Sequence, residues 1–272
     1  MIYPLLLLLQ STTPFGSPIP SILDAPAARV AAPMTMAEVR FGDCIDLAVA
    51  DPPSGIVEAN KWRIEGGAFL ARHCLGFAYA EQFNWDAATT AFVEAAREAE
   101  LDQYPRTAGF WAQAGNAALA GGKAELALEY LNAALVQNTL VGLEQGEVHL
   151  DLARAHVALS DYAAARKQFV HVHALAPQDP LGWLLSATLA RRMKEFEQAK
   201  SDIAVANKLA SGDPAVALEV GNIAYAAGDI VNAKLHWEKA VEMDSESRSA
   251  RAAKSYLAQL GAAAEPANTA TE

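Results

Sequence analysis

The chain has 272 residues, of which 52% are hydrophobic and 19% are charged, so it is long enough and apolar enough to bury a large core. Its formal net charge of -11 repels phosphate backbones, and no cluster of lysine and arginine residues offsets that charge locally. These numbers predict a folded, soluble protein and argue against nucleic acid as a partner.

Residues 1–33 resemble a targeting segment and are expected to be disordered and outside the fold. Residues 2–9 are almost wholly apolar, and a small-x-small motif, Ala25-Pro26-Ala27, follows a proline-rich stretch, as in a secretory signal. No lysine or arginine precedes the apolar run, which is too short to span a bilayer. We therefore expect a periplasmic or secreted protein without a transmembrane span, or a cytoplasmic one if translation begins at Met34 or Met36.

Residues 36–67 are expected to form a degenerate helix pair that is interrupted at Asp51-Pro52-Pro53. Cys44 would lie on the first helix of this pair and Cys74 on the first helix of the next. Neighbouring first helices pack side by side in a stack of helix pairs, so a disulfide between the two cysteines is geometrically possible. The alternative is two reduced, buried thiols that behave as small apolar residues.

From residue 69 to residue 247 the sequence repeats a pattern of 34 residues. The units are 69–102, 108–141, 146–179, 180–213 and 214–247, with short insertions after the first two. A small residue at position 8 and an alanine at position 20 allow the two helices of a unit to approach closely, and a bulky residue at position 24 fills the space towards the next unit. These residues are Gly76, Gly115, Ala153, Ala187 and Gly221 at position 8, Ala88, Ala127, Ala165, Ala199 and Ala233 at position 20, and Phe92, Leu131, Phe169, Ile203 and Trp237 at position 24.

The period, the motif Leu75-Gly76-x2-Tyr79 and the motif Ala88-x3-Phe92-x2-Ala95 resemble the tetratricopeptide repeat family, and Trp62-x3-Gly66-Gly67 is similar to bacterial members. The resemblance implies an all-α fold, a right-handed α-solenoid of helix-turn-helix repeats over residues 34–261. Residues 248–261 would form a capping helix that covers the last apolar face with Ala253, Tyr256, Leu257 and Leu260, and residues 262–272 would form a disordered tail.

No motif in the chain carries recognisable chemistry. The glycines of residues 115–122 and 221–228 fit packing and turn positions rather than a phosphate-binding loop. His149, His156, His171 and His173 fall in one unit and allow a metal or pH-sensitive site, although His149 and His156 occupy positions of partly buried aromatic residues. We predict a non-enzymatic protein without cofactor or metal, and an enzyme with an unrecognised site is the distant alternative.

Members of the family usually bind extended peptides along the concave surface of their first helices, so the resemblance implies the same groove here. At position 9, Asn116 and Asn222 could bond a peptide backbone through both ends of the amide. The family's chaperone-tail clamp needs lysine at position 5, where this chain has His73, Ala112, Leu150, Leu184 and Leu218. The groove positions fall on Gln113, Asn116, Asp151, Arg154, Thr188, Arg191, Arg192, Glu219, Asn222 and Tyr225.

These observations predict a scaffold that holds a protein or peptide partner in the groove, in the bacterial envelope. One alternative is that the groove positions are ordinary solvated helix faces. Another is a structural module that self-associates into oligomers.

Overall fold

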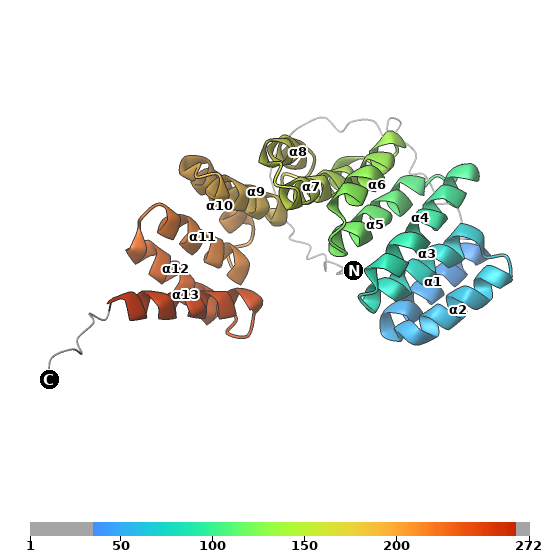
Figure 1. Ribbon diagram of the computed structural model, residues 1–272, viewed down its shortest axis with the longest axis horizontal. Coiled ribbons are helices and arrows are strands. Elements are labelled where there is room, and N and C mark those ends of the chain that lie inside the picture. Colours follow the sequence, from blue (N-terminus) through green and yellow to red (C-terminus); the bar gives the residue numbers. More distant parts are fainter. Residues whose placement is uncertain (1–34, 265–272) are drawn as a thin grey trace, which may run out of the picture. The chain divides into compact units, whose positions relative to one another are not determined.

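The computed structural model describes residues 35–264, and over that range it contains thirteen helices and no strand (Figure 1). The signal-like segment 1–33, Met34 and residues 265–272 lie outside the described range. All the helices belong to one compact unit, Met36–Glu272. In chain order the helices are α1 (Met36–Ala50), α2 (Pro52–Ile64), α3 (Ala68–Glu81), α4 (Trp85–Leu101), α5 (Thr107–Ala120), α6 (Ala124–Val136), α7 (Gly142–Ala158), α8 (Tyr162–Leu175), α9 (Pro180–Arg192), α10 (Phe196–Leu209), α11 (Pro214–Ala226), α12 (Ile230–Met243) and α13 (Arg248–Ala264).

The helices pack in chain order. Each odd-numbered helix from α1 to α11 packs against the even-numbered helix that follows it, and that helix contacts the next odd-numbered one. The first helices of neighbouring units also meet, as α1 meets α3, α5 meets α7, and α9 meets α11. This arrangement confirms the predicted all-α solenoid. Among the helices described here, none is both long enough and apolar enough to cross a membrane.

The contact between the two helices of a unit depends on the predicted pairing of small and large residues. A Cβ atom added to Gly76, Gly115 or Gly221 would lie 2.5 Å from the bulky residue at position 24 of the same unit. The alanines at position 20 are fully buried in all five units. Close approach at these points is what allows each helix pair to exclude water from its contact.

The turn inside each helix pair has the same backbone conformation in all five units. The residue at position 15 has a positive φ in each, at Phe83, Gly122, Ser160, Lys194 and Gly228. The left-handed region favours glycine, yet only two of the five units place glycine there. Asp or Asn side chains then cap several helices, as when Asp161 accepts a hydrogen bond from the Ala164 amide at the start of α8.

Three helix boundaries differ from those expected. Pro52 lies within the first turn of α2 and not in a break between helices. Proline is tolerated there because N–H groups in the first turn of a helix have no partner within the helix, so the missing N–H costs no hydrogen bond. Helix α7 begins at Gly142, four residues before the expected unit. Gly142 has a φ of 56°, so the chain turns at the first residue of the helix. Helix α13 continues past Gly261 to Ala264, because a glycine followed by three alanines costs only about 1 kcal/mol of helix stability.

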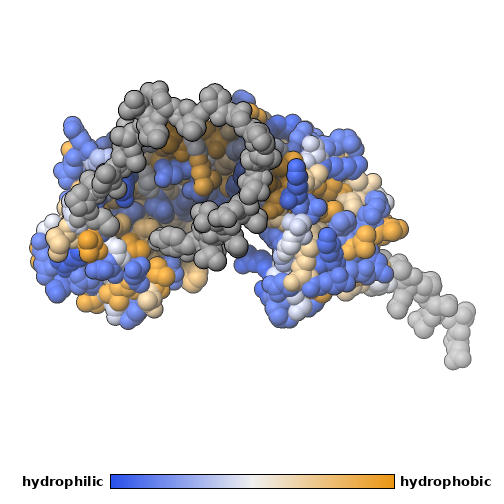
Figure 2. Space-filling model, turned by 180° about the vertical axis from the view of Figure 1, so that it is seen from behind, coloured by the Kyte–Doolittle hydropathy of each residue, from blue (hydrophilic) through white to orange (hydrophobic). Residues whose placement is uncertain are grey.

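Apolar residues remain on the surface of several helices. They include Val57 and Ile64 on α2 and Val231 and Leu235 on α12, all more than half exposed. Figure 2 shows orange apolar patches interspersed with hydrophilic side chains on the face that it presents.

Cys44 and Cys74 are joined by a disulfide in the structure, with their Cα atoms 6.1 Å apart. Cys44 lies on α1 and Cys74 on α3, and both are buried. The two residues are separated by 30 positions in the sequence. The disulfide therefore ties the degenerate helix pair to the first clear repeat.

His73, next to Cys74 on α3, is buried among phenylalanine rings. Its ring centroid lies 3.9 Å from that of Phe110 and 5.2 Å from that of Phe92, and Phe41 stacks on it at 5.4 Å. Among the described residues neither ring nitrogen has a hydrogen-bond partner, and burial lowers the pKa of His73 to about 3. A buried polar group without a partner costs roughly 1–3 kcal/mol of stability.

We expect His73→Leu to stabilise the protein near neutral pH by about 1 kcal/mol, because it removes two unpaired nitrogens. Three of the other four units hold leucine at this position. The folded-state pKa of about 3 lies below the ordinary value of 6.5, so the unfolded chain binds a proton more readily. The wild type should therefore lose stability below pH 6.5, by roughly 2 kcal/mol at about pH 5 through this group. Urea unfolding of both proteins at pH 7 and at about pH 5 measures the loss of unfolding free energy. An equal loss in the variant and in the wild type would refute the role of His73.

Candidate functional site

Nine of the ten predicted groove residues line three pockets along the first helices. Glu219 lines none of the three. We call the surface formed by α5, α7, α9, α11 and α13 the first-helix face. The pockets hold Gln113, Asn116 and Asp151 between α5 and α7, Arg154, Thr188 and Arg192 between α7 and α9, and Arg191, Asn222 and Tyr225 beside α13.

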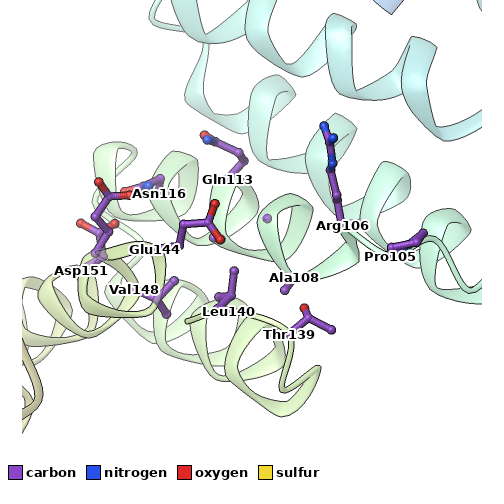
Figure 3. Close-up of a pocket in the computed structure, with 13 residues that line it drawn as sticks. Pro105, Arg106, Ala108, Gln113, Asn116, Thr139, Leu140, Glu144, Val148 and Asp151 are labelled. Carbon is purple, nitrogen blue, oxygen red and sulfur yellow. The ribbon is translucent and has the colours of Figure 1, made fainter. Parts of the chain in front are cut away.

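The pocket between α5 and α7, which we call the acidic pocket, has a volume of about 430 Å³. Figure 3 shows Asn116 of α5 beside Asp151 of α7, with Glu144 also lining the pocket. Burial raises the pKa of Asp151, against the opposing effects of Arg154 and of a hydrogen bond with Asn116. Burial and the neighbouring carboxylates, Asp151 first among them, raise the pKa of Glu147. Arg106 also lines the pocket, but three carboxylates outnumber it, and this excess of negative charge favours a cationic group.

The pocket beside α13, which we call the aromatic pocket, has a volume of about 450 Å³. Trp237 forms its floor, with its ring centroid 5.5 Å from that of Tyr225 and 5.1 Å from that of Tyr256. Tyr225 is 50% exposed, while Trp237 is buried. Arg191 and Gln259 add polar groups to the lining. An apolar floor with a few polar groups is typical of sites that bind an apolar side chain.

Several predicted groove residues bond to each other across neighbouring units. Glu219 of α11 accepts hydrogen bonds from Arg191 of α9 at 2.6 Å and from Asn222 at 3.0 Å. The other end of the Asn222 amide accepts a hydrogen bond from the Trp237 indole at 3.1 Å. Both ends of the Asn222 amide, which was predicted to bond a peptide backbone, are therefore already engaged within the chain by a buried carboxylate and a buried indole.

The same pattern recurs between α5 and α7. Asp151 is buried and accepts a hydrogen bond from Arg154 at 2.7 Å, and it also bonds to Asn116. The acid at position 6 therefore joins a first helix to the one before it in both places. Within the described part of the chain, Gln113 and Arg192 form no side-chain hydrogen bond or ion pair, so their polar groups are free to meet a ligand.

The four histidines of repeat 146–179 do not gather at one point, since His149 and His171 contact each other while His156 and His173 each contact other residues. His149 Nδ1 is 2.7 Å from Gln168 Oε1, and its ring stacks on that of His171 at 4.6 Å. His156 lies 3.9 Å from Asp161, and His173 stacks on Trp183. Over residues 35–264, no three side chains of the metal-binding types come together in a possible metal site.

Solved structures show which fold this arrangement represents. A protein described as Pseudomonas aeruginosa pilF matches with a TM-score of 0.63 and 16% identity, over 83% of this chain and 100% of that one. TTC0263, a thermophilic TPR protein of Thermus thermophilus, matches with a TM-score of 0.55 and 17% identity, over 71% of this chain and 98% of that one. YrrB, described as a TPR protein with an unusual peptide-binding site, matches with a TM-score of 0.51 and 16% identity, over 72% and 96% of the two chains.

This chain has the tetratricopeptide-repeat fold. At 16–17% identity the likeness concerns the fold and not the ligand. A scan with protein-family models finds no match, and a search of curated proteins finds none either. The repeat motifs of the sequence and the solved structures therefore indicate the same fold, although no family model matches the chain.

Sequence reasoning missed part of both larger pockets. Glu144 lies on the first turn of α7, before the expected start of the unit at Gly146, and Glu147 lies inside that unit but was not named among the groove residues. Tyr256 was expected to be covered by packing. Tyr256 is 37% exposed and lines the aromatic pocket. The spacing of Glu144, Glu147 and Asp151 at intervals of three and four residues was the available signal, since it places all three on one helix face.

Proposed function

We propose that this tetratricopeptide array is a non-enzymatic scaffold that binds a segment of a protein partner along its first-helix face. The supporting observation is that the acidic pocket, the small pocket between α7 and α9 and the aromatic pocket lie along successive first helices. A segment that runs along these helices can place one side chain in each. The description of YrrB as having a peptide-binding site shows that this fold can serve such a purpose.

The two larger pockets suggest the chemistry of the partner. Glu144, Glu147 and Asp151 suit a lysine or arginine side chain, whereas Tyr225, Trp237 and Tyr256 suit an apolar or aromatic one. The proposed partner segment therefore carries a basic residue near one end and an apolar residue near the other.

The test is site-specific photocrosslinking in the native host. A photoreactive phenylalanine analogue replaces Tyr225 on the first-helix face or, as the control, Leu235, which is 56% exposed on α12. We expect one discrete crosslinked partner from position 225 and none from position 235. The combined substitution Gln113→Ala and Arg192→Ala should reduce the amount of this product at least several-fold. Gln113 lines the acidic pocket and Arg192 the small pocket between α7 and α9, so each substitution removes a polar group that could bond to the partner.

Matched variants separate binding from folding. Lys167→Ala and Lys208→Ala change exposed residues of α8 and α10 and should leave the crosslink intact. Equal products from positions 225 and 235 would refute the first-helix face as the binding surface. A product with twice the mass of the chain would instead favour self-association.

We also propose that the scaffold works in the bacterial envelope. The support is the signal-like segment 1–33 together with the Cys44–Cys74 disulfide, a bond that persists in oxidising compartments. Determination of the mature amino terminus in the host tests this proposal. A mature chain that begins at Met1, Met34 or Met36 and is recovered from the cytoplasm would refute it.

A further inference from the structure

A cavity of about 200 Å³ lies among α8, α9 and α10, where the repeats 146–179 and 180–213 meet. It contains none of the predicted groove residues. Phe169 and Leu189 line both this cavity and the small pocket between α7 and α9, so they form the wall between the two. The polar residues in its lining are Arg166, His173, Ser186, Gln198 and Asp202.

The repeat pattern does not require polar residues at these positions. Ser186 stands at position 7, where the other four units have Leu75, Ala114, Leu152 and Val220. His173 stands at position 28, where three of the other four units have alanine, leucine or valine. At position 23 no other unit carries a carboxylate, whereas this one has Asp202. Position 7 is apolar in all the other units and position 28 in three of them, and a carboxylate stands at position 23 only in repeat 180–213, so this set of polar groups is not a general feature of the repeat.

Asp202 is a buried carboxylate whose hydrogen-bond donors are neutral. Its side chain accepts a hydrogen bond from Ser186 Oγ at 2.6 Å and one from Gln198 Nε2 at 2.7 Å, and the residue is only 2% exposed. Within the described chain no lysine or arginine forms an ion pair with it. A buried carboxylate is stabilised far more by a cation than by neutral donors, so the site is favourable for a positive charge from outside the chain.

The neighbouring groups add acceptors rather than cations. His173 donates one ring N–H to the Gly182 carbonyl, and its buried Nε2 atom has no partner within residues 35–264. Burial lowers the pKa of His173, against the opposing effects of the Asp202 charge and of the Gly182 hydrogen bond, and Nε2 of a neutral ring can accept a hydrogen bond. Arg166, the cation of the lining, is engaged by Glu195 of the same chain. Phe169, Val170 and Leu189 provide apolar walls.

We propose that this cavity binds an alkylammonium group, with its charge at Asp202 and its methylene chain against the apolar walls. An ammonium group has three donors and no acceptor, which complements a carboxylate and an unpaired imidazole nitrogen. The group can come from the lysine side chain of a protein or from a free small amine. This site is separate from the first-helix face and does not depend on the function proposed for that face.

The experiment is an NMR titration of the full-length protein with n-butylammonium chloride at constant ionic strength, with n-butanol as the uncharged control. We expect saturable amide shifts around Ser186 and Asp202 with a Kd on the order of millimolar, given the few atoms of the probe. n-Butanol should bind at least tenfold more weakly. Equal binding of the two probes to the wild type would overturn the proposal without any variant, as would the absence of saturation by n-butylammonium.

Two variants test the role of the carboxylate. Asp202→Asn keeps the shape of the side chain and should weaken n-butylammonium binding at least tenfold. Glu197→Gln removes an equal charge from an exposed position of α10 and should leave binding unchanged. Undiminished binding to Asp202→Asn would overturn the proposal.

A second titration identifies the source of the ammonium group. N-acetyl-lysine N-methylamide presents the lysine side chain with peptide bonds on both sides. Binding at least as tight as that of n-butylammonium would assign the site to a lysine of a partner protein. Binding of n-butylammonium alone would assign it to a free amine, and either result would support the ammonium site.

Discussion

Reduction of the Cys44–Cys74 disulfide is expected to lower the free energy of unfolding by about 3–4 kcal/mol, the chain-entropy value for a loop of this length. The bond joins α1 to α3, and within residues 35–264 the pair of α1 and α2 has a neighbouring unit on one side only. Because a repeat is stabilised by its neighbours, the loss should appear first as unfolding of α1 and α2. Urea unfolding with and without a phosphine reductant measures the loss, and hydrogen exchange locates it.

The control for reduction is the double variant Cys44→Ala and Cys74→Ala. Its stability should match that of the reduced wild type within about 1 kcal/mol and should not respond to the reductant. Two free thiols in unreduced protein isolated from its host would contradict the disulfide. Equal stability of the oxidised and reduced wild type would contradict its structural role.

Gly221→Ala is expected to destabilise the array by about 2–3 kcal/mol through overpacking. The added Cβ atom would lie 2.5 Å from Trp237 Cδ1, 2.6 Å from Nε1 and 3.1 Å from the Ala233 carbonyl oxygen. The indole cannot easily move aside, since it is hydrogen-bonded to Asn222 and contacts Tyr225 and Tyr256. Thermal unfolding measures the loss, and tryptophan fluorescence should show a changed environment for Trp237.

The matched control is Gly42→Ala in α1. No heavy atom lies within 4 Å of the Cβ that this substitution adds. Alanine in a helix interior should then stabilise the protein by roughly 0.5–1 kcal/mol. If Gly221→Ala changed the stability in the same way as Gly42→Ala, the contact between Gly221 and Trp237 would not require glycine at position 221.

The aromatic pocket also depends on Gly221, because Trp237 is its floor. A shift of the indole would break its hydrogen bond to Asn222 and disturb the Glu219–Arg191 ion pair that shares Asn222 as a neighbour. The contact between Gly221 and Trp237, which lets α11 and α12 pack closely, therefore also shapes the surface proposed for binding.

The hydrogen-bond networks around Asp151 and Glu219 show what could be predicted about the first-helix face from the sequence and what could not. The sequence predicted that Asn116, Asp151, Glu219 and Asn222 lie on first helices, and each does. It did not predict that Asp151 and Glu219 bond to residues of the preceding unit, because that contact depends on how neighbouring first helices meet in space. The polar side chains most available to a partner are consequently others, Gln113 and Arg192 among them.

By itself the sequence determined the repeat, its two-helix unit and the close contact between positions 8 and 24, because backbone geometry and side-chain volume repeat every 34 residues and leave a local signal. Only the tertiary structure decided which polar residues face each other across units. It alone placed Asp202 beside Ser186 and His173, and Tyr256 beside Trp237. Those pairings join residues that are distant in sequence or belong to different units, and their distances follow from helix packing that no local pattern specifies.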